Sequence, residues 1–154
     1  MRTIAEYIQS TSPQLVAAGQ NLLLIDSISC NRGYVIHRNG SGILTLRGIT
    51  GGNNCFARYA VEFNGNIAIP TGGAVAPIAI ALSIDGEPVQ SSRAIVTPAA
   101  VGSYSNVTCT AIVTVPKGCC NTIAVENVPA GVDVVVAQQA INVADGNLRV
   151  TRIS

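Results

Sequence analysis

Charged residues are scarce in this sequence, and their scarcity excludes several classes of protein. Asp, Glu, Lys and Arg make up 11% of the 154 residues, against about 25% in an ordinary globular protein. Lys117 is the only lysine and the formal net charge is +1. The chain therefore lacks the basic surface that phosphate backbones require, and we expect no nucleic-acid partner. Hydrophobic residues reach 48%, which predicts that part of the surface is buried against copies of the chain or another partner.

Long apolar runs are also missing. The longest, Ala74–Leu82, contains Pro77 and is far shorter than the roughly 20 residues that a membrane-spanning helix needs. The N-terminal segment contains Glu6 and lacks the apolar core of a secretory signal. We therefore expect no membrane association, and synthesis in the cytoplasm without a signal peptide.

Residues that carry catalysis are few and scattered. His37 is the only histidine, so Ser–His–acid or Cys–His catalysis would have to run through it. The sequence has no nucleophile elbow and no HExxH motif. Its carboxylates form no dense run of the kind found in an EF-hand loop. We predict a protein that is not an enzyme, with no catalytic, cofactor-binding or metal-binding residues and no cofactor.

The five cysteines do not form a recognisable framework. An odd number in a reducing compartment argues against a complete set of disulfides. No CxxC pair is present, and adjacent cysteines are poorly suited to hold one tetrahedral zinc ion. We interpret them as small, buried hydrophobic side chains, with metal or redox chemistry as the alternative. They are Cys30, Cys55, Cys109, Cys119 and Cys120.

Strand signals, in contrast, are abundant from Gln14 to the end. Runs rich in Val, Ile and Thr are bounded by Gly, Pro, Asn or Asp, with no helical period between them, which predicts a sandwich or barrel. Asn64–Gly65 falls inside the longest run, where we expect a bulge or a break. The predicted strands are Gln14–Ala17, Asn21–Ser29, Tyr34–Arg38, Ile43–Arg47, Cys55–Ile69, Val75–Ile84, Ser91–Val96, Tyr104–Val115, Thr122–Asn127, Val132–Ala140 and Asn147–Ile153.

Only the N-terminus has helical character. Ile4, Tyr7 and Ile8 recur at helical spacing within Arg2–Gln9, a segment too short to form a stable helix alone. We predict that residues 1–13 form an arm that docks on a partner through these three side chains. A frayed terminus is the alternative. The domain itself is expected to span residues 14–154.

Alternation within Cys55–Phe63 separates two faces. Tyr59, Val61 and Phe63 share one face, which predicts contact with the core. The other face carries Phe56, Arg58, Ala60 and Glu62, a mixture that is unusual for a solvated strand face. We predict that this second face is buried against another subunit.

The order of these segments resembles the TNF-like jelly-roll superfamily, which includes the complement globular heads. The resemblance covers Gln14–Ser154, and it departs from the family pattern at Cys55–Phe56, where a glycine usually precedes the aromatic residue. The matching segments are LVAAGQNLLLIDSI, YVIHRNGSGILTLRG, FARYAVEF, IAIALSIDGEPV, SYSNVTCTAIVTVPKG, TIAVENV and NLRVTRI.

This resemblance implies a single antiparallel jelly-roll sandwich that assembles as a homotrimer. Phe56, Arg58, Ala60 and Glu62 would then face the three-fold axis, together with one face of Thr108–Val115 and one face of Asn147–Ile153. Arg58 and Glu62 would pair between subunits, and a surface pair worth little is the alternative.

Three shorter segments, CNRGYVIHR, ARYAVEF and LSIDGEPV, resemble small virion proteins of bacteriophages and prophages. That narrower resemblance implies a capsid decoration or cement protein on the virion surface, with the major capsid protein as its partner. The alternative is a receptor- or glycan-binding tip of a fibre or of a spore surface, because the same fold occurs in exosporium glycoproteins.

Overall fold

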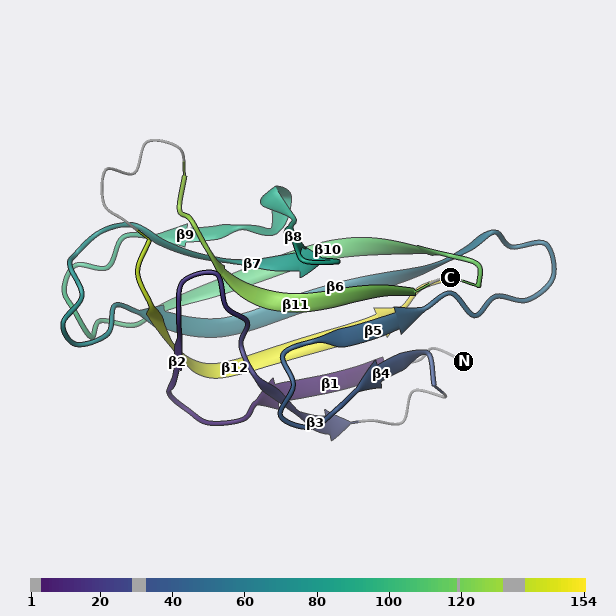
Figure 1. The fold of residues 1–154 in the computed structure, drawn as a ribbon, viewed down its shortest axis with the longest axis horizontal. Coiled ribbons are helices and arrows are strands. Elements are labelled where there is room, and N and C mark those ends of the chain that lie inside the picture. The colour runs from purple at the N-terminus through teal and green to yellow at the C-terminus, as the bar shows by residue number, and fades with distance from the viewer. Residues whose placement is uncertain (1–3, 29–32, 119, 132–137) are drawn as a thin grey trace.

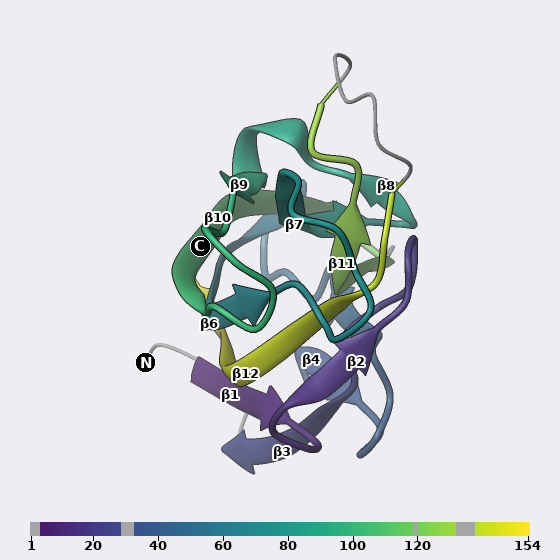
Figure 2. The same cartoon turned by 90° about the vertical axis from the view of Figure 1, so that its left-hand side faces the viewer.

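Two antiparallel sheets face each other in the computed structural model, which describes residues 4–28, 33–118, 120–131 and 138–154. Their strands run along the long axis of the molecule, so the connecting loops gather at its two ends (Figure 1). Figure 2 looks onto the end that carries the loops leading into β7 and β10. The predicted all-β sandwich is confirmed.

The first sheet has the strand order β10-β6-β12-β1-β3, and the short strand β2 also pairs with β12. Its longest members, β10, β6 and β12, are adjacent and bring together the middle and the C-terminal part of the sequence. The strands are β10 (Ser105–Pro116), β6 (Phe56–Ala68), β12 (Ile141–Arg152), β1 (Ile4–Gln9), β3 (Leu24–Ile28) and β2 (Gln14–Val16).

The second sheet has the order β4-β5-β11-β7-β8, and β9 also pairs with β7. Within the described residues the single helix is the 3-10 turn η1 (Gln90–Ser92), and no helix there is long and apolar enough to cross a membrane. The strands are β4 (Val35–His37), β5 (Leu44–Arg47), β11 (Cys120–Val128), β7 (Ile78–Ile84), β8 (Glu87–Pro88) and β9 (Ala94–Val96).

The core lies between the two sheets and follows the alternation in the sequence. Tyr59, Val61 and Phe63 are buried, as predicted. β7 departs from simple alternation, because Ala79 and Ala81 on its other face are buried as well. Of the predicted strand Val132–Ala140, residues 132–137 lie outside the described residues and 138–140 are not in a strand.

The N-terminal segment is a strand, so the prediction of a helical arm was wrong. β1 pairs with β12 on one side and with β3 on the other. Tyr7 is 1% exposed and belongs to the core, whereas Ile4 and Ile8 remain exposed on the outer side of the sheet. Backbone pairing on both sides outcompetes two helical turns that nothing else stabilises. Tyr7 therefore cannot serve as a docking residue, and residues 4–9 are part of the domain.

The expected irregularity at Asn64–Gly65 lies in the neighbouring strand instead. β6 continues through this dipeptide, and the register of β12 shifts between Ala144 and Asn147. Gly65 and Gly146 both lie against the ring of Phe63, where a Cβ on Gly146 would stand 3.2 Å from the ring and 2.7 Å from Gln9 Oε1.

We expect Gly146→Ala to destabilise the domain by about 1–3 kcal/mol, because the new methyl group overpacks this region. Chemical denaturation measures the effect. Gly51→Ala is the control, since a Cβ there meets no atom within 4 Å. Equal unfolding free energies for the two variants would contradict the prediction.

Candidate functional site

The outer side of the first sheet, which we call the assembly face, carries apolar side chains where a solvated sheet is usually polar. Ile112 on β10, Ala60 on β6, Thr151 on β12 and Ile4 on β1 are partners in register and form one row across four strands. Ile112 is 60% exposed and Ile4 45% exposed. Both would gain free energy from burial, at about 25 cal/mol for each Å² removed from water.

The next row on the assembly face is charged. Arg149 on β12 lies opposite Glu62 on β6 and opposite Glu6 on β1. Glu6 accepts a hydrogen bond from the Ser27 hydroxyl at 3.2 Å. Among the described residues, no ion pair joins Arg149 to Glu62 or to Glu6. Arg149 and Glu62 are therefore available to groups outside the subunit.

The four predicted interface residues do share this face. Ala60 is half-buried and lies in the middle, whereas Phe56, Arg58 and Glu62 are exposed. The Arg58 guanidinium stacks on the Phe56 ring, 4.7 Å from its centroid. Among the described residues it forms no ion pair with Glu62. The prediction of an intersubunit pair between Arg58 and Glu62 stays a prediction.

Sequence reasoning missed the contribution of β1 to this face. Ile4 and Ile8 were assigned to a separate arm, although they point outward beside β12. The pattern that identifies them is a period of two: Ala5, Tyr7 and Gln9 are buried and alternate with exposed or half-buried residues.

The assembly face becomes polar toward the end that Figure 2 shows. Thr108 donates from its hydroxyl to Asn64 Oδ1 at 3.2 Å, and Asn106 donates from its side-chain amide to Asn66 Oδ1 at 3.1 Å. These side chains therefore form hydrogen bonds with one another across β10 and β6. The apolar row is thus limited to the middle of the face.

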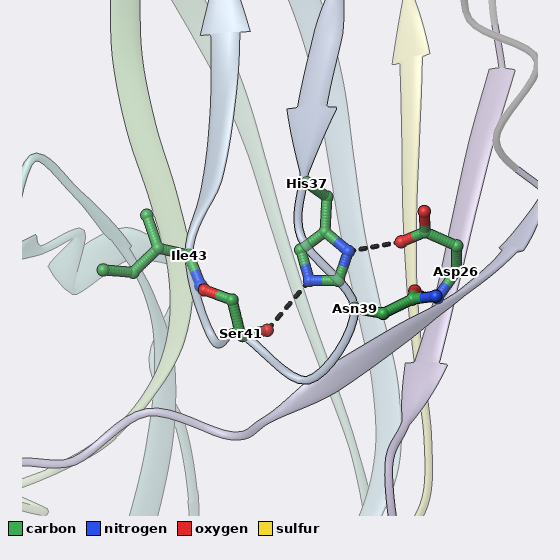
Figure 3. Close-up of polar contacts among 5 residues, drawn as sticks. All are labelled: Asp26, His37, Asn39, Ser41 and Ile43. Atoms are coloured by element: carbon green, nitrogen blue, oxygen red, sulfur yellow. Dashed lines mark hydrogen bonds and ion pairs between the residues drawn. The ribbon is translucent and has the colours of Figure 1, made fainter.

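His37 is a buried group that links the two sheets (Figure 3). Its side chain is 1% exposed, and Nδ1 contacts the Asp26 carboxylate on β3. Nε2 lies 2.8 Å from the carbonyl oxygen of Ser41 in the turn between β4 and β5. The edge of the Tyr7 ring packs against the imidazole at 4.8 Å between centroids. β3 belongs to the first sheet and β4 to the second, so this contact closes the sandwich along one side.

The turn after β4 is further fixed to β3 by its own polar groups. The Asp26 backbone N–H donates to Asn39 Oδ1 at 2.8 Å. Gly40 donates to the carbonyl of Leu24 at 2.8 Å, and Leu24 donates to the carbonyl of Ser41 at 3.1 Å. The Asn39–Gly40 turn between β4 and β5 is therefore also part of the contact between the two sheets.

The surroundings of His37 do not suit catalysis. A general base needs a ring nitrogen within reach of a substrate proton, yet Nε2 faces the backbone carbonyl of Ser41 and the ring is sealed from solvent. The Ser41 hydroxyl accepts from the Ile43 backbone N–H at 3.1 Å instead of contacting the imidazole. The His37–Asp26 pair is a structural element.

The described cysteines differ in exposure. Cys109 is buried, as the sequence interpretation expected, but Cys55 and Cys120 are exposed, which corrects that interpretation for these two. Cys30 and Cys119 lie outside the described residues. Within the described residues no group of three or more His, Cys, Asp or Glu side chains is arranged to hold a metal ion.

Burial raises the pKa of the Cys109 thiol to about 11, against a smaller opposing effect of the Ala94 backbone hydrogen bond. The thiolate is the reactive form, so at pH 8 only about one Cys109 side chain in a thousand is reactive. We expect iodoacetamide at pH 8 to alkylate Cys55 and to spare Cys109 until the protein is unfolded. Peptide mass spectrometry reads out both sites, and equal rates at the two would show that Cys109 is not shielded.

Comparison with known proteins identifies the fold. No family model and no curated protein matches the sequence. Among solved structures, the chain is similar to murine APRIL at pH 5.0, with 9% identity, a TM-score of 0.59 and coverage of 99% of this chain and 100% of that chain. It is similar to the globular domain of zebrafish complement 1qA, with 10% identity, a TM-score of 0.54 and coverage of 99% of this chain and 97% of that chain. It is also similar to Eiger TNF from S. frugiperda, with 9% identity, a TM-score of 0.63 and coverage of 99% of this chain and 93% of that chain.

Proposed function

We propose that this chain is a non-catalytic structural protein that assembles as a homotrimer through its assembly face and decorates the capsid of a bacteriophage. The premise is the TNF-like jelly-roll fold, which the chain has over nearly its full length. The observation that carries the proposal is the apolar row of Ile112, Ala60 and Ile4 in the middle of an exposed sheet face. The three-fold stoichiometry is what the resemblance to TNF-like proteins implies.

The charged row supports assembly between identical subunits. Glu62, Arg149 and Glu6 alternate in sign across three strands and are not paired with one another. A second copy that covers this row must place charged or hydrogen-bonding groups against it, because a buried charge without a partner is costly. The row thus selects a fixed register between subunits, while the apolar row supplies the free energy of burial.

One end of the molecule is suited to dock on a capsid. The loops 69–77 and 97–104 contain no charged residue and are joined by a hydrogen bond from the Gly102 N–H to the Ile69 carbonyl at 2.9 Å. Val75, Val101 and Tyr104 are exposed there. Such a surface fits an uncharged, largely apolar region of a partner, which is the contact we propose for the major capsid protein.

Electron microscopy of phage particles from the source tests the proposal. We expect antibodies against this chain to label three-fold knobs on the heads, and particles from a strain without the gene to lack both label and knobs. Label restricted to the tails would replace the decoration function with a fibre tip. A chain absent from purified particles would overturn the virion assignment.

A further inference from the structure

The opposite end of the molecule is cationic. β5 ends and β6 begins at this end of the molecule (Figure 1). Arg47 is the last residue of β5, Arg58 is the third residue of β6, and Lys117 lies in the turn after β10. Arg152 closes β12 at the same end. The ranges 47–58, 116–118 and 152–154 contain no Asp or Glu. Hydrogen bonds hold these segments together, from Lys117 N–H to the Cys55 carbonyl at 2.8 Å and from Arg58 N–H to the Ser154 carbonyl at 3.2 Å.

None of these four cations forms an ion pair with an Asp or Glu side chain within the described part of the chain. Three of them donate hydrogen bonds to oxygens of the chain: Arg152 Nε to Ser154 at 3.2 Å, Arg47 Nη1 to Gly33 at 3.2 Å and Lys117 Nζ to Gly52 at 3.3 Å. Arg152 stacks on the Tyr34 ring at 4.3 Å, and its Nη1 is buried without a hydrogen-bond partner. Burial raises the pKa of the nearby Tyr59 hydroxyl, against the opposing effect of Arg152, so this phenol stays neutral beside the guanidinium. A cluster of like charges without counter-charges attracts anions.

A hollow of about 310 Å³ lies within this cationic end and is lined by Asn53, Asn54, Cys55, Phe56, Arg58 and Ser154. That volume lies at the lower limit of typical small-ligand sites. The side-chain amides of Asn53 and Asn54 make no hydrogen bond to another described residue, and the Arg58 guanidinium stacks on the Phe56 ring at 4.7 Å. The hollow therefore combines a cation, two amides without hydrogen-bond partners among the described residues and an aromatic ring that is 42% exposed.

We infer that this hollow binds an acidic saccharide, with the carboxylate of one sugar on Arg58. A guanidinium pairs with a carboxylate through two parallel hydrogen bonds. Sugar hydroxyls both donate and accept hydrogen bonds, as do the side-chain amides of Asn53 and Asn54. The exposed part of the Phe56 ring provides an apolar surface for the sugar ring. The neighbouring cations Lys117, Arg47 and Arg152 favour an anionic chain over a neutral one.

A saccharide fits better than a nucleic acid. Nucleic-acid binding draws most of its affinity from many phosphate contacts, and the chain as a whole has a net charge of only +1. A hollow lined by one cation and two side-chain amides instead favours one carboxylate flanked by hydroxyl groups. Phe56 and Arg58 belong to the assembly face, but they lie at the start of β6, at the end of that face and beyond the apolar row of Ile112, Ala60 and Ile4. The inference therefore requires that the proposed assembly leaves this end of the face accessible.

The test is an NMR titration of the ¹⁵N-labelled full chain with sialyllactose, with lactose as the matched neutral sugar. We expect shifts at Asn53, Asn54, Phe56 and Arg58 with sialyllactose only, and affinity about tenfold weaker in Arg58→Ala. Arg38→Ala removes an exposed arginine from the β4–β5 turn and serves as the charge-matched control, with affinity equal to wild type. Circular dichroism confirms the fold of each variant.

Several outcomes would overturn the site: equal shifts with lactose, unchanged affinity in Arg58→Ala, or tighter binding of a single-stranded oligonucleotide than of the sugar. The monomeric variant described below separates this inference from the proposed assembly, because all lining residues belong to one subunit. Sugar binding by that variant but not by wild type would show that assembly covers Arg58, and would overturn the site in the assembled protein.

Discussion

Asp26→Ala is expected to destabilise the domain by about 1–3 kcal/mol, the cost of leaving a buried polar group without its hydrogen-bond partner. The substitution removes the partner of His37 Nδ1 in a position where the His37 side chain is 1% exposed. The Asp26 side chain is itself 26% exposed, so solvent relieves part of the loss. Denaturant unfolding at one fixed protein concentration measures the change, because assembly also contributes to stability.

A double-mutant cycle measures the interaction energy between His37 and Asp26. His37→Ala alone also removes the ring that packs against Tyr7 at 4.8 Å, so its cost includes a cavity. If the two side chains interact, the double variant costs less than the sum of the single variants, by up to about 3 kcal/mol. Strict additivity would contradict the interaction. Glu87→Ala removes an exposed carboxylate on β8 and should change stability by under about 0.5 kcal/mol.

The strands could be predicted from sequence because local chemistry defines them. In β6 the period of two separates Tyr59, Val61 and Phe63 from Arg58 and Glu62, and pairing with β10 and β12 preserves that separation. The turn at Asn39–Gly40 can likewise be predicted from sequence, because Asn and Gly tolerate a positive φ. In the structure Gly40 has a φ of 87°. These features depend on neighbours a few residues away.

The segments that sequence reasoning missed depend on distant partners. Ile4, Tyr7 and Ile8 fit a helical period, and only the pairing of β1 with β12, at the other end of the sequence, makes the segment a strand. The His37–Asp26 contact requires that β3 and β4 enter different sheets whose edges meet. Nothing in the local pattern of residues 24–41 specifies that arrangement.

Ile112→Asp is expected to convert the assembly into monomers. Ile112 is 60% exposed in the subunit and lies in register with Ala60, in the middle of the assembly face. In a trimer the substitution buries a carboxylate in each interface without a positively charged partner, which costs several kcal/mol for each ion. In a monomer the same carboxylate is solvated and the fold is retained. Light scattering should therefore fall from the mass of three 15.8 kDa chains to that of one.

Ile36→Asp is the matched control, because Ile36 is 52% exposed on β4 of the second sheet, away from the assembly face. It makes the same chemical change on a surface of similar exposure, so a trimer should persist. A general effect of added charge on solubility or stability would act equally on both variants. If Ile112→Asp remains trimeric, or if wild type is already monomeric at micromolar concentration, the exposed row on β10, β6 and β1 is not the surface through which the subunits associate.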